Sequence, residues 1–141
     1  MNNFIKLFAF VCMIFSVSMV NAQASKTATV APDGLIVLDA STDLASEYVA
    51  NISRFNFASF QEASTYFDKY ISKTAGRGMS FFFDIPNQKM IIYIDAANQG
   101  LVPRKASGQV TAAELNFFLN EVHKGRIWSH ISFQQLSKIW I

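Results

Sequence analysis

The sequence predicts an α+β fold in which an antiparallel sheet with a central β-hairpin packs on two or three helices. Two segments, 60–75 and 112–122, place apolar residues at helical spacing, and each follows a helix-capping motif. Between them, segments 79–85 and 89–95 switch to the two-residue alternation of strands around a turn-forming connection. Apolar residues thus recur about every 3.6 positions in the two helical segments and at every second position in the hairpin. This change of spacing predicts the α+β class.

The first 22 residues have the pattern of a secretory signal peptide. Lys6 is the only charged residue among them, residues 7–20 are almost entirely apolar, and Val20-Asn21-Ala22 offers the small residues that a signal peptidase accepts. The apolar stretch is shorter than the roughly 20 residues of a membrane-spanning helix. We therefore expect cleavage after Ala22 and no stable membrane anchor afterwards.

Removal of this leader would take the only cysteine, Cys12, out of the chain. Small secreted domains of eukaryotes commonly rely on disulfides. An exported domain without a thiol therefore favours the bacterial envelope, in the periplasm or outside the cell. Eleven basic and ten acidic residues would remain, and this balance predicts neither a nucleic-acid partner nor polybasic attachment to membranes.

The next elements begin after residues 23–33, which we expect to be a flexible N-terminal segment that precedes a single domain at 34–141. Residues 35–38 are apolar and rich in β-formers, and they predict a short buried strand. Leu44, Tyr48, Ile52 and Phe55 then recur at spacings of four, four and three. This spacing predicts a helix over about 44–54.

The helix at about 60–75 has the clearest boundaries. Ser59 and Glu62 form a capping box at its start, and Gly76 is suited to the left-handed conformation that ends helices. Apolar residues on one side predict its buried face.

The hairpin pairs residues 79–85 with residues 89–95 across Pro86-Asn87-Gln88. The apolar residues of one face predict that it is buried. Phe82, Ile91 and Tyr93 on the opposite face are too apolar for a bare surface. We expect that second face to be partly covered or to be a contact surface.

A long connection over 96–110 precedes the last predicted helix, which starts at the capping box of Thr111 and Glu114 and ends at Gly125. The remaining residues suit a short strand over about 126–131 followed by a short helix. The resulting order is the βαββαβ of a ferredoxin-like split βαβ unit, with an extra helix at 44–54. The alternative is a simpler hairpin covered by three or four helices.

The sequence carries no strong catalytic, metal or cofactor motif. It lacks the patterns Gly-x-Ser-x-Gly, His-Glu-x-x-His and Cys-x-x-Cys. His123 and His130 are the only histidines, and their spacing matches no standard zinc site. We expect no cofactor and no metal, and we expect His123 to favour the negative end of its helix dipole.

These observations predict an exported interaction module that acts through protein contacts, with a second protein or with itself, and not by catalysis. Large aromatic side chains are typical anchors of protein interfaces, and Arg104 and Lys105 in the long connection are the best candidates for a polar contact. The candidates for protein binding are Phe82, Tyr93, Arg104, Lys105, Trp128 and Trp140.

Two alternatives remain at this point. One is a protease-inhibitor or propeptide-like domain that acts in trans on a separate enzyme. The other is a small hydrolase or lyase that uses His123 or His130 together with Asp84 or Asp95, which requires a histidine and a carboxylate in contact.

Overall fold

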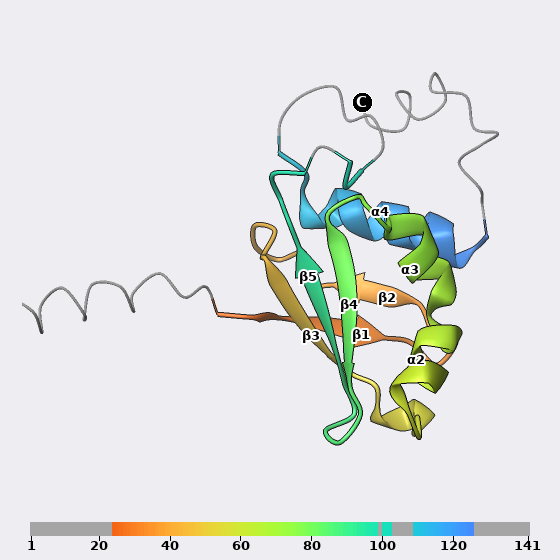
Figure 1. Ribbon diagram of the computed structural model, residues 1–141. Coiled ribbons are helices and arrows are strands. Elements are labelled where there is room, and N and C mark those ends of the chain that lie inside the picture. Colours follow the sequence, from red (N-terminus) through yellow and green to blue (C-terminus); the bar gives the residue numbers. More distant parts are fainter. Residues whose placement is uncertain (1–23, 99, 103–108, 126–141) are drawn as a thin grey trace, which may run out of the picture.

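The computed structural model describes residues 24–98, 100–102 and 109–125, and these form an α+β fold (Figure 1). An open mixed sheet has the strand order β2-β1-β3-β5-β4. The strands are β1 (Lys26–Val30), β2 (Ile36–Leu38), β3 (Glu47–Asn51), β4 (Met79–Asp84) and β5 (Lys89–Ile94). The helices are α2 (Phe60–Tyr66), α3 (Asp68–Thr74) and α4 (Ala112–His123), with a 3-10 turn η1 (Ser53–Phe55).

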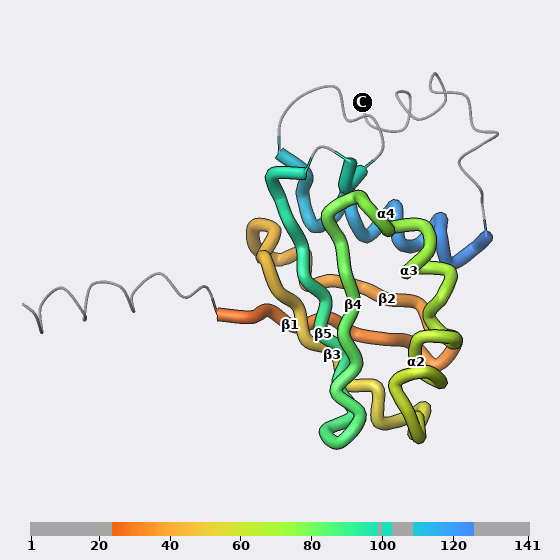
Figure 2. The backbone as a smooth tube through the Cα atoms, in the orientation of Figure 1, coloured from red at the N-terminus to blue at the C-terminus, as the bar shows by residue number. Residues whose placement is uncertain are grey.

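Three helices cover one face of the sheet, and the backbone path is followed in Figure 2. Every strand alternates buried and more exposed residues, so one side chain in two enters the core. The largest core side chains, each almost fully buried, are Tyr48, Tyr70, Phe67, Phe118, Ile36, Leu38, Ile52, Met90, Ile92, Leu101, Leu115 and Leu119. The opposite face of the sheet has no described helix over it.

The hairpin of β4 and β5 is confirmed, and so is the strand predicted at 35–38. The hairpin is not central, however, because β4 is the edge strand of the sheet. Gln88 adopts a left-handed conformation with φ of 49°, and it closes the turn by donating its backbone N–H to Ile85. The last helix is also confirmed, with both hydrogen bonds of the Thr111–Glu114 capping box present.

Residues 26–30, expected to belong to the flexible N-terminal segment 23–33, form strand β1 inside the sheet. It pairs antiparallel with β2 and parallel with β3. Ala28 and Val30 are buried while Thr27 and Thr29 are exposed. This alternation was not recognised because the residues of the segment are small or polar.

The helix predicted at 44–54 is wrong, because β3 occupies Glu47–Asn51. Tyr48 and Ile52, four residues apart, lie on one face in both a helix and a strand, so their spacing does not separate the two structures. Ala50, between them, is fully buried as well, and this position fits only the strand.

The helix predicted at about 60–75 is divided into α2 and α3 at Phe67, whose ring is fully buried. Ser59 accepts a hydrogen bond from the Glu62 backbone as predicted. The Glu62 carboxylate reaches past Ser59, however, and accepts from the Ala58 backbone N–H. Gly76 has the expected positive φ of 71°.

The described order of three strands, two short helices, a hairpin and a helix is not the ferredoxin-like order. The strand and helix predicted after residue 126 lie outside the described residues. In the long connection, Leu101 and Val102 are buried in the core, and their burial was not predicted.

Candidate functional site

The uncovered face of the sheet carries an apolar row in register across β3, β5 and β4, and Thr27 of β1 continues it. Thr27 of β1 lies beside Val49 of β3, Val49 lies beside Ile91 of β5, and Ile91 lies beside Phe82 of β4. All four side chains point away from the helices because their neighbours along each strand are the buried ones. Phe82 is 48% exposed, and Val49 and Ile91 are partly exposed.

Polar side chains flank this row on both sides. Glu47, Tyr93 and Ser80 form the neighbouring row toward one end of the strands, and Tyr93 is 44% exposed. Asn51, Lys89 and Asp84 form the row toward the other end. An apolar centre with a polar rim is the usual anatomy of a protein-binding surface. We call these three rows the open face.

A shallow hollow of about 550 Å³ lies at the Tyr93 end of the open face. It is lined by Ser46, Glu47, Gly78, Met79, Ser80, Tyr93, Ile94 and Asp95. Asp84 lies at the opposite end of the hairpin, beside Lys89. At about 3.3 Å per residue, the length of β5 separates Asp84 from Asp95 by roughly 20 Å, so the two carboxylates do not form a catalytic pair.

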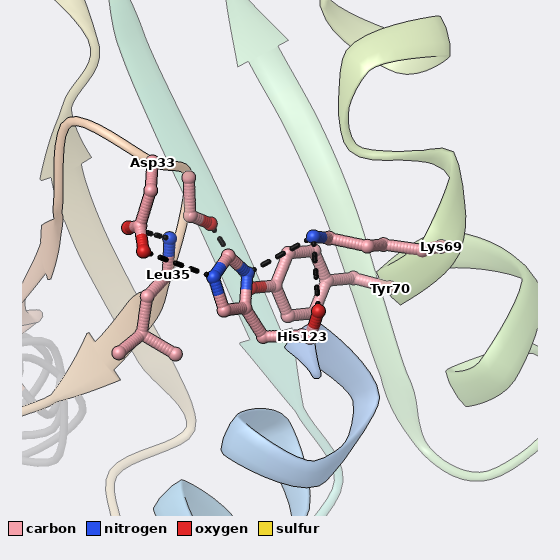
Figure 3. Close-up of polar contacts among 6 residues, drawn as sticks. Asp33, Leu35, Lys69, Tyr70 and His123 are labelled. Atoms are coloured by element: carbon pink, nitrogen blue, oxygen red, sulfur yellow. Dashed lines mark hydrogen bonds and ion pairs between the residues drawn. The ribbon is translucent and has the colours of Figure 1, made fainter. Parts of the chain in front are cut away.

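His123 lies at the junction of α3, α4 and the turn between β1 and β2 (Figure 3). Its Nε2 is 3.2 Å from Oδ2 of Asp33, and its Nδ1 is 2.9 Å from Nζ of Lys69. The Tyr70 hydroxyl is 3.0 Å from the same Nδ1 and donates to the Gly34 carbonyl at 2.9 Å. The rings of Tyr70 and His123 are stacked.

Both nitrogens of the His123 ring have partners. Lys69 Nζ and the Tyr70 hydroxyl lie within hydrogen-bond distance of Nδ1, and Asp33 lies within that distance of Nε2. His123 therefore links α4 to α3 and to the turn between β1 and β2.

The environment of the junction changes two acidities. The pKa of Asp33 is lowered, first by the hydrogen bond from the Leu35 backbone and then by the one from His123. Burial raises the pKa of Tyr70 to about 12, and the charge of Asp33 acts in the same direction. Tyr70 is fully buried, whereas the Asp33 side chain is 67% exposed.

His123 lies at the end of its helix as predicted, but its partners were not predicted. Asp33 is 90 residues away along the chain, and no local pattern links it to His123. A hollow of about 390 Å³ adjoins the junction beside Asp33, Lys69 and Tyr66. His123 does not line it, and its side chain is only 15% exposed.

Of the six predicted contact residues, the structure brings Phe82 and Tyr93 together on the open face. Arg104, Lys105, Trp128 and Trp140 lie outside the described residues, as does His130. Within the described ranges, no group of three or more His, Cys, Asp or Glu side chains could hold a metal ion. No helix in those ranges has the length and apolar character needed to cross a membrane.

No protein-family model matches the chain, and neither a curated protein nor a solved structure is similar to it. A proposal about function must therefore rest on the open face and on the junction at His123.

Proposed function

We propose that this protein is an exported interaction module that binds another protein chain through the open face of its sheet. The observation that carries the proposal is the register of Val49, Ile91 and Phe82, which forms one continuous apolar row on a face that no described helix covers. Exposed aromatic side chains within an apolar patch are the usual anchors of protein interfaces.

The junction at His123 supports catalysis less well. The hydrolase alternative required a histidine beside Asp84 or Asp95, whereas the carboxylate in contact with His123 is Asp33. Both ring nitrogens already face protein atoms, so a substrate would have to displace Lys69 or Asp33. These contacts suit a structural joint between α3, α4 and the β1–β2 turn.

Site-specific photo-crosslinking in the cells that make the protein tests the proposal. A photoreactive phenylalanine analogue at position 82 or 93 should give a discrete crosslinked product. The same analogue at Lys73, which is exposed on α3, serves as the control. Crosslinks from Lys73 alone, or none from either open-face position, would contradict the proposal.

Export is a separate part of the proposal, and it rests on the sequence of residues 1–22. The native product should begin at Gln23 when cleavage follows Ala22. N-terminal sequencing of the protein recovered from the envelope or the medium measures this. Recovery of the chain with Met1 still attached would contradict export by cleavage.

A further inference from the structure

The hollow at the Tyr93 end of the open face holds two carboxylates beside an exposed aromatic ring. Glu47 of β3 lies directly opposite Tyr93 of β5 in the register of the sheet, and Tyr93 is 44% exposed. Asp95 follows Tyr93 by two residues and is exposed, so the two side chains leave the same face of the sheet. All three residues line the hollow of about 550 Å³.

The hollow stays open beside Asp95 because the residue opposite has no side chain. The Asp95 N–H donates to the Gly78 carbonyl at 2.7 Å, which continues the pairing of β4 with β5 by one residue. Gly78 has a φ of 89°, and a Cβ atom added to it would lie 2.6 Å from Cβ of Asn98. The backbone here therefore requires glycine.

One cation over the Tyr93 ring would lie within reach of both carboxylates. Residues directly opposite on antiparallel strands have Cβ atoms about 5 Å apart, and this is the relation of Glu47 to Tyr93. Residues two apart along a strand are separated by about 7 Å, and this is the relation of Asp95 to Tyr93. An ammonium or guanidinium group can thus contact the face of the ring and both acidic side chains.

The described basic residues leave these two carboxylates unneutralised. Within the described ranges, no ion pair joins Glu47 or Asp95 to a basic side chain. Arg77 does not line the hollow, and its guanidinium donates to the Gly100 carbonyl at 3.5 Å. Lys89 lies four residues from Tyr93 along β5, roughly 13 Å away. The chain has a formal net charge of +2, so the acidic end of the open face is a local feature.

The apolar row beside the hollow sets a second requirement for a partner. Ile91 precedes Tyr93 by two residues on β5, so the row begins about 7 Å from the Tyr93 ring. A matching partner would place an apolar side chain on this row and a basic side chain about 7–14 Å from it. An acidic or wholly apolar partner would instead cover Glu47 and Asp95 without neutralising them, which is unfavourable.

We propose that the hollow receives a lysine or arginine side chain of the protein that binds the open face. The cation lies over Tyr93 between Glu47 and Asp95, and an apolar side chain of the same partner packs on Val49, Ile91 and Phe82. This inference rests on the proposed function, since it names the chemistry of the partner.

The hollow can be tested without the partner by an NMR titration of the purified protein as its cells deliver it. We expect n-butylguanidinium to shift the signals of Glu47, Tyr93 and Asp95, and neutral n-butylurea to bind at least about 5-fold more weakly. Glu47→Gln should weaken binding of the cation by about 2- to 5-fold. Tyr93→Phe keeps the ring and should retain binding, whereas Tyr93→Leu should lose it. Equal binding of the two probes would overturn the inference.

Photo-crosslinking from position 82, in the cells that make the protein, tests the partner. Glu47→Lys should reduce the crosslinked product by about 5- to 10-fold, because the cation of the partner then meets a second cation. Asp68→Lys reverses an exposed carboxylate on α3 and is the matched control, which should leave the product unchanged. Circular dichroism shows that each variant folds. Once mass spectrometry has identified the partner, replacing its basic residue by glutamate should restore the product with Glu47→Lys.

The outcomes separate this inference from the proposed function. A product from position 82 that Glu47→Lys leaves unchanged would overturn the inference while the proposed function stands. Absence of any product from the wild-type chain would contradict the proposed function, and would remove the partner from this inference even if n-butylguanidinium binds. A product that joins position 82 only to this chain, within one copy or between two, would also overturn the assignment to a different protein.

Discussion

Tyr70 links the buried core to the junction at His123, and its ionisation should limit stability in alkaline solution. Burial raises its pKa from 10.0 to about 12 in the folded protein. A raised pKa means that the contribution to stability is complete below pH 10 and is lost as the pH rises toward 12. The loss amounts to about 2–3 kcal/mol at most.

Tyr70→Phe should remove the loss of stability that ionisation of Tyr70 causes at high pH. At pH 8 the variant should be less stable by about 0.5–1.5 kcal/mol, because the hydrogen bond to Gly34 is lost. Between pH 10 and 12 the difference from wild type should shrink or reverse. Urea unfolding at several pH values measures it, and a difference that stays constant up to pH 12 would contradict the assignment.

Asp33 gives the matching prediction in acid. Its pKa is lowered below 3.8 by the Leu35 N–H and by His123, so its contribution is present above that value and is lost as the pH falls through the folded-state pKa. Asp33→Asn retains an acceptor for Leu35 but cannot ionise. The stability of wild type relative to Asp33→Asn should therefore be greater at pH 6 than at pH 2.5, and the reverse order would show that the charged Asp33 carboxylate does not stabilise the fold.

At the scale of elements, Asn116 determines how the β2 edge ends. Asn116→Ala would leave the Leu38 N–H and C=O without their partner in a part-buried position, which should cost about 1–3 kcal/mol. Asn120→Ala, at another part-buried position one turn later in α4, is the control and should cost less. Equal losses in chemical denaturation would show that the contact with β2 contributes nothing.

The elements that the sequence predicted correctly are those whose signals are local. The hairpin follows from alternation on both sides of one turn, and α4 follows from a capping box and an apolar face, so neither needs information from distant residues. Strand β3 and the division at Phe67 depend on packing between elements. The partners of Asn116 and His123 are 78 and 90 residues away, and no local pattern encodes such pairs.

For the whole molecule, the register of the sheet explains why the predicted contact surface could be located only in part. Sequence alternation identified Phe82 and Tyr93 as surplus apolar residues. It could not show that Val49 continues their surface, because β3 was mistaken for a helix. The register of the sheet joins three separate segments into one face.

Amide hydrogen exchange should reveal which amides of β4 bond to β5 and which face the edge of the sheet. In a monomer, the amides of Ser80, Phe82 and Asp84 should exchange slowly because they bond to β5, whereas those of Met79, Phe81 and Phe83 should exchange rapidly. Uniform protection along β4 would mean that another part of the same chain covers the edge.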